Sequence, residues 1–292
     1  MVAPICLFVF NRPEKTQATL SALKKNDLAD ESDLFIFCDG PRDTRDNKKI
    51  RETRKYVQQI NGFKSVTIQE SETNIGLANS IIKGVSQTIE KYGNVITLED
   101  DLISSTNFLL FMNEALDFFQ SNSRIFSISG YTPDLSSLHN YSKDFYLGYR
   151  ASSWGWGTWK NRWGNVDWTI SDYPSFKNNL RRNIQFMRGG SDLPQMLYNQ
   201  MHGIIDSWAI RWCYSQFVQN QLTVFPSKSK INNVGFGEDS THTRCIKGFN
   251  TPLDSGEQKH FNFQSSIKLN ASLVKEFRKK YSFISRIRNK FV

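Results

Sequence analysis

The sequence is poor in the features that mark several common classes of protein. Its 292 residues include four cysteines, Cys6, Cys38, Cys213 and Cys245, which lie far apart and form no C-x-x-C pair. This spacing argues against a disulfide scaffold and against a structural zinc site. A reduced, cytosolic setting is the simplest expectation. No run of 18 apolar residues is present, so no membrane-spanning helix is expected.

The motifs of several well-known sites are also missing. There is no G-x-x-x-x-G-K-[ST], which argues against a P-loop ATPase, and no G-x-G-x-x-G after the first apolar run, which argues against a dinucleotide-binding Rossmann domain. Neither G-x-S-x-G nor H-E-x-x-H occurs. Hydrophobic residues nevertheless make up 39% of the chain, which is ample for a core at this length.

The net charge of +9 is concentrated at one end. Residues 268–292 contain eight lysines and arginines against one acid, Glu276, and so carry +7, which leaves +2 for the rest of the chain. From Val274 onward apolar residues recur every three or four positions, which predicts an amphipathic helix. Residues 273–292 thus suit an anionic membrane surface, and the protein is expected in the cytoplasm, peripheral on the inner face of the cell membrane.

Two alternatives to membrane binding remain for this tail. The first is a helix docked on the body of the protein with a solvated basic face. The second is binding to nucleic acid, which is disfavoured because the body has no basic stripe and no recognisable nucleic-acid motif. We therefore expect no nucleic-acid partner.

Apolar strands alternate with helical stretches along the first 130 residues. Strands are predicted at residues 5–10, 34–38, 65–69, 95–98 and 125–128, and helices at 14–25, 46–60, 77–91 and 108–119. This alternation predicts βαβ units and an α/β fold with a mainly parallel sheet flanked by helices. Residues 131–175 read as an aromatic loop region that holds five of the seven tryptophans, followed by a helix at 206–218 and a strand at 222–225.

Polar side chains follow three of the predicted strands. Asn11 and Arg12 follow the first strand, and Asp39 follows the second. Ligands bind outside the carboxyl ends of the strands in open α/β sheets, so Arg12 is a candidate for pairing with phosphate and Asp39 for contact with a base or ribose. The alternatives are a surface salt bridge for Arg12 and a turn residue for Asp39.

The sharpest feature is the acidic triplet Glu99-Asp100-Asp101 after the fourth strand. Three adjacent carboxylates repel one another, and a divalent cation compensates this repulsion. Hard oxygen ligands suit Mg²⁺ or Mn²⁺, which would stabilise the charge of a departing phosphate. The alternative is a solvated acidic turn that caps the helix after it.

Several motifs together resemble the A-fold glycosyltransferases, in particular bacterial sugar transferases related to N-acetylglucosaminyltransferase I. They occur in the order of that family over residues 7–243, and they are Leu7-Phe8-Val9-Phe10-Asn11-Arg12-Pro13, Asp39, Asn74-Ile75-Gly76-Leu77, Leu98-Glu99-Asp100-Asp101, Ser153-Trp154-Gly155-Trp156, Asp206-Ser207-Trp208 and Gly235-Phe236-Gly237…Thr241-His242.

The resemblance implies a donor site for a UDP-sugar in residues 1–130. Arg12 would lie at the nucleotide-phosphate end and Asp39 would bind uracil. Glu99 and Asp100 would contact the ribose and the donor sugar, and Asp101 would bind Mn²⁺ or Mg²⁺ directly. Three further residues, Asn11, Asn74 and Gly76, belong to the same donor side.

The resemblance also implies a catalytic and acceptor half in residues 131–267, with 268–292 as a basic tail. Asp206 would deprotonate the acceptor hydroxyl, and His242 would lie near the diphosphate as a second metal ligand. Ile205 replaces the aromatic residue that the family has before its catalytic aspartate. The alternative role of Asp206 is that of a helix N-cap.

The aromatic stretch offers further candidates. Flat rings stack on sugar faces, and Trp154 and Trp156 are the candidates for the closed donor site. The alternative is core packing within a loop-rich region.

The predicted activity is a metal-dependent, inverting sugar transfer to a glycan or lipid-linked acceptor in surface polysaccharide synthesis, with N-acetylglucosamine as one candidate sugar. Two other functions compete. A nucleotidyltransferase would need a glycine-rich basic loop near the N-terminus, which is not seen. A non-enzymatic module that binds membrane or nucleic acid leaves the acidic triplet and Asp206 unexplained.

Overall fold

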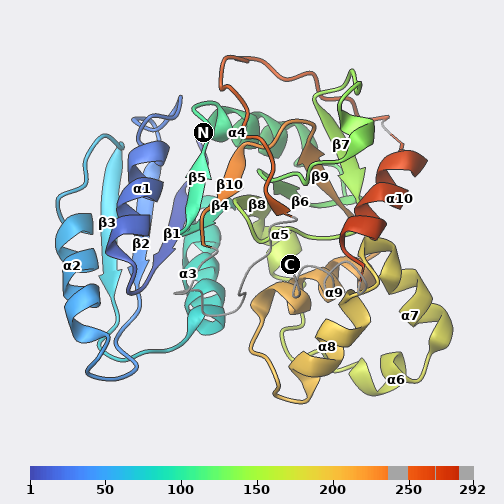
Figure 1. Ribbon diagram of the computed structural model, residues 1–292, viewed down its shortest axis with the longest axis horizontal. Coiled ribbons are helices and arrows are strands. Elements are labelled where there is room, and N and C mark those ends of the chain that lie inside the picture. The colour runs from blue at the N-terminus through green and yellow to red at the C-terminus, as the bar shows by residue number, and fades with distance from the viewer. Residues whose placement is uncertain (236–248, 267, 283–292) are drawn as a thin grey trace.

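The computed structural model describes residues 1–235, 249–266 and 268–282 and is built around an eight-stranded sheet in the order β3-β2-β1-β4-β8-β6-β9-β7 (Figure 1). The strands are β1 Ile5–Val9, β2 Asp33–Cys38, β3 Ser65–Glu70, β4 Asn94–Glu99, β6 Ile125–Ser129, β7 Phe145–Gly148, β8 Trp156–Trp159 and β9 Leu222–Pro226. All run parallel except β7 and β8, which run the opposite way. A separate pair, β5 (Leu102–Ser104) and β10 (Ile231–Asn233), is antiparallel.

Helices cover both faces of the sheet. Alternate side chains of β1 point to opposite faces, so Ile5, Leu7 and Val9 enter one core and Cys6 and Phe8 enter the other. The first core includes side chains of α1 (Pro13–Leu23), α2 (Asn47–Val57) and α4 (Phe108–Phe119). The second includes side chains of α3 (Leu77–Tyr92) and α9 (Trp208–Val218). The predicted α/β class, a mainly parallel sheet flanked by helices, is confirmed.

The aromatic region is more ordered than the sequence suggests. It contains β7, β8 and the short helix α5 (Lys160–Trp163), and α6 (Tyr173–Lys177) begins within it. Helices α7 (Leu180–Phe186) and α8 (Leu193–Met201) follow. The prediction of a loop is therefore wrong for β7 and β8. Each strand has only four residues, which is too short for an alternating hydrophobic pattern to be recognised in the sequence. Strand β8 fits between β4 and β6 because Gly157 has no side chain and leaves room for the carbonyl oxygen of Val95.

The C-terminal helix α10 (Ala271–Lys280) docks on the body. Leu273 and Phe277 are buried in a core with Phe225, and the ring of Tyr281 lies 4.4 Å from the guanidinium carbon of Arg150. The structure thus shows the docked helix, the alternative that the sequence left open. Over residues 271–281 the apolar side of the helix packs on the protein, whereas a helix that binds a membrane surface would expose it. The rest of the predicted membrane segment, 283–292, lies outside the described residues. No helix among the described residues is long and apolar enough to cross a membrane.

Candidate active site

Adjacent strands bring Arg12 and the acidic triplet together. Strands β1 and β4 are parallel neighbours, and Phe8 is in register with Glu99, so the residues that follow both strands meet at one edge. Arg12 Nη1 donates to Asp101 Oδ2 at 2.8 Å and to Asp100 Oδ1 at 3.4 Å. A solvated turn does not describe this triplet, because Asp100 is buried and Arg12 is mostly covered.

The three carboxylates outnumber the cation that faces them. Burial raises the pKa of Glu99 to about 8, and the nearby charges of Asp101 and Asp100 add to that rise. Burial, followed by the charge of Asp101, raises the pKa of Asp100 to about 7, while Arg12 opposes both shifts. Among the described residues, Glu99 has no hydrogen-bond or ion-pair partner. The strand end therefore holds a surplus of carboxylate oxygens.

A divalent cation fits this donor set. Carboxylate oxygens are the ligands that Mg²⁺ and Mn²⁺ prefer, and such cations commonly bind through one or two carboxylates together with substrate phosphates. Within residues 1–235, 249–266 and 268–282, no group of three or more His, Cys, Asp or Glu side chains is arranged to hold a metal by itself. The nucleotide would therefore complete the shell. The predicted second ligand, His242, lies outside the described residues.

Gly235 presses directly against Asp101. The small β5–β10 sheet leads the chain back to the triplet, where Val234 N donates to Asp101 O at 2.9 Å and Gly235 N to Asn233 Oδ1 at 2.6 Å. A Cβ on Gly235 would overlap Asp101 Oδ2. The absence of a side chain at position 235 therefore holds open the space that the Asp101 carboxylate occupies.

Gly235→Ala is expected to weaken manganese-dependent UDP binding about tenfold or more, because the new methyl group displaces the carboxylate that we assign to the metal. The free energy of unfolding should change by less than about 1 kcal/mol, since a side-chain end can move aside. Calorimetry and urea unfolding measure the two effects. Gly164→Ala, at an exposed glycine with φ of −64°, is the matched control. Unchanged UDP binding by Gly235→Ala would contradict the assignment.

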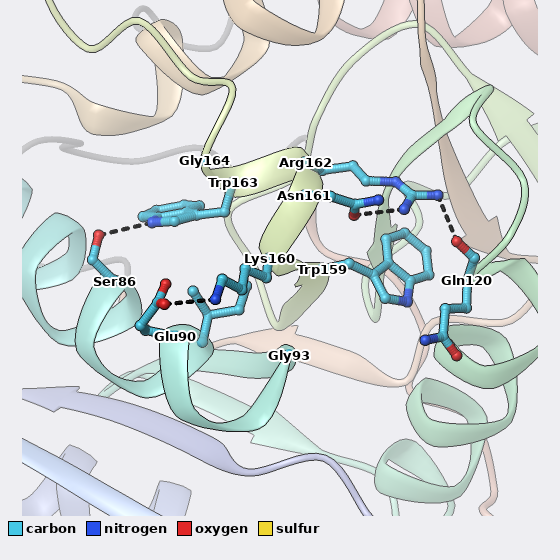
Figure 2. Close-up of a pocket in the computed structure, with 11 residues that line it drawn as sticks. Ser86, Glu90, Gly93, Gln120, Trp159, Lys160, Asn161, Arg162, Trp163 and Gly164 are labelled. Atoms are coloured by element: carbon cyan, nitrogen blue, oxygen red, sulfur yellow. Dashed lines mark hydrogen bonds and ion pairs between the residues drawn. The ribbon is translucent and has the colours of Figure 1, made fainter.

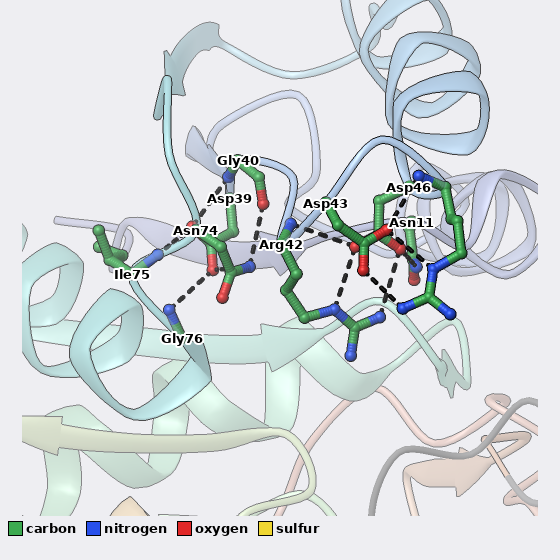
Figure 3. A network of polar contacts seen from close by, with 10 residues as sticks. Asn11, Asp39, Gly40, Arg42, Asp43, Asp46, Asn74, Ile75 and Gly76 are labelled. Carbon is green, nitrogen blue, oxygen red and sulfur yellow. Dashed lines mark hydrogen bonds and ion pairs between the residues drawn. The ribbon is translucent and has the colours of Figure 1, made fainter.

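Asp39 acts as a clamp on the loop before α3 (Figure 3). Its Oδ1 accepts from Gly40 N at 2.8 Å and Ile75 N at 3.0 Å, and its Oδ2 accepts from Asn74 Nδ2 at 3.0 Å and Gly76 N at 3.1 Å. These four donors use the lone pairs of both oxygens. Asp39, Asn74 and Gly76 thus lie together, and a base could donate to this carboxylate only by displacing one of its present partners.

Asp39→Asn is expected to lower the free energy of unfolding by about 2 kcal/mol, because an amide NH₂ would face donors where a carboxylate oxygen now accepts. Urea unfolding measures the loss. Asp33→Asn provides a control, since that carboxylate accepts from the side chains of Ser65 and Tyr92 and pairs with Lys64 at 3.9 Å. A stable Asp39→Asn protein that has lost only UDP binding would refute the clamp and favour direct base recognition.

A second network lies beside the end of β1, and two of its members were not predicted. Asn11 Nδ2 donates to Asp46 Oδ1 at 2.6 Å, and Asp46 also accepts from Arg42 N and Nε at 3.2 and 3.1 Å (Figure 3). These contacts, the Arg42 side chain first, lower the pKa of Asp46. The Arg42 guanidinium lies 4.8 Å from the centre of the Phe10 ring and is half exposed. The only sign of Arg42 in the sequence is its position directly after Asp39-Gly40-Pro41.

Of the two predicted tryptophans, one fits a site and the other does not. Trp154 is partly exposed and packs edge-on against Tyr131 at 4.5 Å between ring centres. Trp156 is buried on β8 among Trp163, Trp208 and Trp212, so its ring cannot stack on a sugar. The prediction for Trp156 is therefore wrong, because alternation along β8 turns its side chain into the core.

Asp206 lies just before α9 and is exposed. The N-cap of this helix is Ser207, whose Oγ accepts from Ile210 N at 3.4 Å, so the alternative role of Asp206 as the cap is not what the structure shows. Asp206 Oδ1 instead accepts from Arg211 Nη2 at 3.3 Å. Arg211 also donates to the carbonyl oxygens of Ser207 and Trp168, and it therefore holds the carboxylate at the surface.

A hollow of about 540 Å³ lies at the opposite end of β4 from the triplet, where Gly93 precedes the strand (Figure 2). Several of its polar side chains have partners. Lys160 Nζ pairs with Glu90, Trp163 Nε1 donates to Ser86, and Arg162 donates to the carbonyl oxygen of Gln120. These groups serve packing, and the hollow offers no chemistry comparable to the triplet.

Comparison with known proteins gives similarity of structure only. No family model and no curated protein matches the sequence. The chain is similar to TarS of S. aureus (TM-score 0.41, 10% identity), covering 78% of this chain and 36% of TarS, so it spans about a third of that protein. It is also similar to the mannosyltransferase PcManGT of Pyrobaculum calidifontis, solved with GDP-Man and Mn²⁺ (TM-score 0.41, 10% identity), covering 74% of this chain and 70% of the other. Both TM-scores are below 0.5, and neither similarity establishes a function for this chain.

Proposed function

We propose that the protein is a metal-dependent, inverting glycosyltransferase that moves a sugar from a UDP-sugar to a glycan or lipid-linked acceptor. N-acetylglucosamine is one candidate sugar, and surface polysaccharide synthesis is the process it would serve. The observation that carries the proposal is the strand-end cluster, where Arg12 faces Asp100 and Asp101 while the Glu99 side chain has no hydrogen-bond or ion-pair partner within the described part of the chain. A surplus of buried carboxylates beside one guanidinium suits a cation bound to a diphosphate.

The donor side of the site combines opposite charges. Asp101, and with it the carboxylates beside it, would hold Mn²⁺ or Mg²⁺, which when bound neutralises the charge that builds up on the departing diphosphate. Arg12 is within reach of the same phosphates, and its present ion pair keeps the guanidinium at the strand end. Asp39 orders residues 74–76 and so shapes the wall of the donor site. Trp154 supplies a partly exposed ring at the neighbouring loop.

Asp206 is the proposed base. An exposed carboxylate held by Arg211 can accept the proton of an acceptor hydroxyl as that oxygen attacks the anomeric carbon. Attack from the side opposite the leaving UDP inverts the configuration at that carbon. The proton passes to Asp206, and the electron pair of the broken bond leaves with the diphosphate.

A panel of nucleotide sugars tests this function. UDP-, GDP- and other nucleotide-linked sugars are incubated with the protein and Mn²⁺, and release of the free nucleotide is measured. Release from a UDP-sugar that stops on addition of EDTA and resumes with Mn²⁺ supports the proposal. Release from a GDP-sugar alone would correct the donor. Formation of a nucleotide sugar from a sugar phosphate and a nucleoside triphosphate would establish a nucleotidyltransferase instead.

A further inference from the structure

Helix α7 exposes two large aliphatic side chains. Leu180 is 76% exposed and Ile184 is 54% exposed, and they lie one turn apart on the same side of the helix. The opposite side is anchored, because Phe186 is buried against Phe176 and Tyr214. The exposed pair is therefore held on a fixed helix and does not belong to a frayed end.

Basic residues surround this pair. Residues 173–191 contain four basic residues and no acidic one, although the body as a whole is nearly neutral. Arg181 and Arg188 are exposed. Arg181 follows Leu180 on α7, and Arg188 lies about one turn after Ile184 in the 3₁₀ turn Met187–Gly189. Neither arginine has an ion pair with any described residue. In contrast, Arg182 points inward and pairs with Asp172 at 2.9 Å.

A shallow hollow adjoins the same helix. It has a volume of about 260 Å³ and is lined by Arg182, Arg188, Tyr149 and Phe217, with Val218, 49% exposed, beside them. The Arg188 guanidinium lies 5.5 Å from the centre of the Tyr149 ring. Arg182, which pairs with Asp172, and the buried Phe186 line this hollow, so it lies toward the anchored side of α7. The exposed Arg181 and Arg188 are therefore the groups that can meet anionic headgroups while acyl chains contact Leu180 and Ile184.

We propose that the α7 face, defined as Leu180, Arg181, Ile184 and Arg188, binds the surface of an anionic lipid bilayer. Leu180 and Ile184 enter the boundary between headgroups and acyl chains, and the arginines pair with lipid phosphates. Helix α10 packs beside the turn after α7, at the same edge of the molecule (Figure 1), and its exposed Lys275 and Arg278 add positive charge there. A bilayer is favoured over a nucleic acid because a polyanion offers no apolar layer for Leu180 and Ile184.

The test is sedimentation of the full chain with vesicles of phosphatidylcholine alone and of phosphatidylcholine mixed with phosphatidylglycerol. Binding is expected only to the mixed vesicles and is weakened by salt. Arg181→Glu with Arg188→Glu should reduce the affinity about thirtyfold or more, because each basic residue at the surface contributes about fivefold and each substitution also adds a negative charge. Leu180→Ser with Ile184→Ser should reduce it about tenfold. All four side chains are exposed, so these changes leave the core untouched.

The matched control is Lys49→Glu with Lys55→Glu on α2, which makes the same change of charge at the opposite edge of the sheet. Equal loss of binding in this control would overturn the proposal, since net charge alone would then decide binding. Loss in the arginine variant with full binding in the Leu180/Ile184 variant would also overturn it and favour a soluble polyanion. UDP binding should be unchanged in every variant, so failure here is distinguishable from failure of the proposed transferase function.

Discussion

Asp101→Ala is expected to abolish manganese-dependent UDP binding and to lower the rate of sugar transfer by at least about a thousandfold. Among the three carboxylates, Asp101 is the one that Arg12 contacts at 2.8 Å and that Gly235 leaves room for. Its loss removes the assigned ligand of the cation. Calorimetry with UDP, with and without Mn²⁺, measures the binding, and UDP release measures the rate.

The fold should survive this substitution. Arg12 keeps its contact with Asp100 at 3.4 Å, and the removal of one of three neighbouring carboxylates relieves the charge repulsion that helps to raise the pKa values of Glu99 and Asp100. We expect the free energy of unfolding to change by about 1 kcal/mol or less.

Asp27→Ala is the control for Asp101→Ala. Asp27 is also ion-paired, with Lys259 at 2.6 Å, but lies far along the chain from the triplet, after α1. UDP binding that is equal in wild type and Asp101→Ala, and equally dependent on Mn²⁺, would show that the metal binds elsewhere. Binding lost in both variants would point to a general loss of structure.

The parallel half of the sheet was predictable because its signals are local and long. Strands β1 and β2 are mostly apolar, β4 has three apolar residues at buried positions, and β3 is the weaker signal. Helices α1 to α3 separate these strands at a spacing typical of βαβ units. The strand ends then follow from topology, which is why Arg12 and the triplet could be expected to meet before any contact was known. In the structure, Phe8 of β1 is in register with Glu99 of β4, and this pairing brings the two strand ends together.

The aromatic half was less predictable because long-range packing decides it. Trp156 and Trp154 are two residues apart and equally aromatic, yet one is buried among three other tryptophans and the other is partly exposed. The difference comes from the pairing of β8 with β4 and β6, which no local pattern encodes. For the same reason the sequence could not show that α10 buries its apolar side on the body, where Phe225 of β9 receives Phe277.

The sequence alone could not decide the role of Asp39, because the contacts that define this role come from a loop far along the chain. An aspartate in Asp-Gly-Pro is typical of a turn, and the sequence placed Asn74 and Gly76 on the same donor side without a contact between them. Only the fold shows that its two oxygens receive four donors from two loops. The same carboxylate thus belongs to the candidate site through the loop that it holds.

Asp206→Asn is expected to leave UDP and manganese binding unchanged and to lower kcat about a thousandfold, because an amide cannot accept the proton of the acceptor hydroxyl. The amide oxygen of asparagine can still accept from Arg211, and Ser207 still caps α9, so the local structure should persist. The measurement is transfer to the acceptor beside calorimetry with UDP. Asp117→Asn, an exposed aspartate on α4, controls for the loss of a surface charge.

The kinetic parameters of Asp206→Asn distinguish a catalytic base from a residue that only binds the acceptor. Loss of a base lowers kcat at saturating acceptor and removes the acidic limb of the pH–rate profile, whereas loss of a binding contact raises KM for the acceptor and leaves that limb in place. Arg211 sharpens the distinction, because its contacts with the carbonyl oxygens of Ser207 and Trp168 hold it in place independently of Asp206. Full kcat in Asp206→Asn would remove Asp206 as the base while leaving the metal and donor assignments to stand on Asp101 and Arg12.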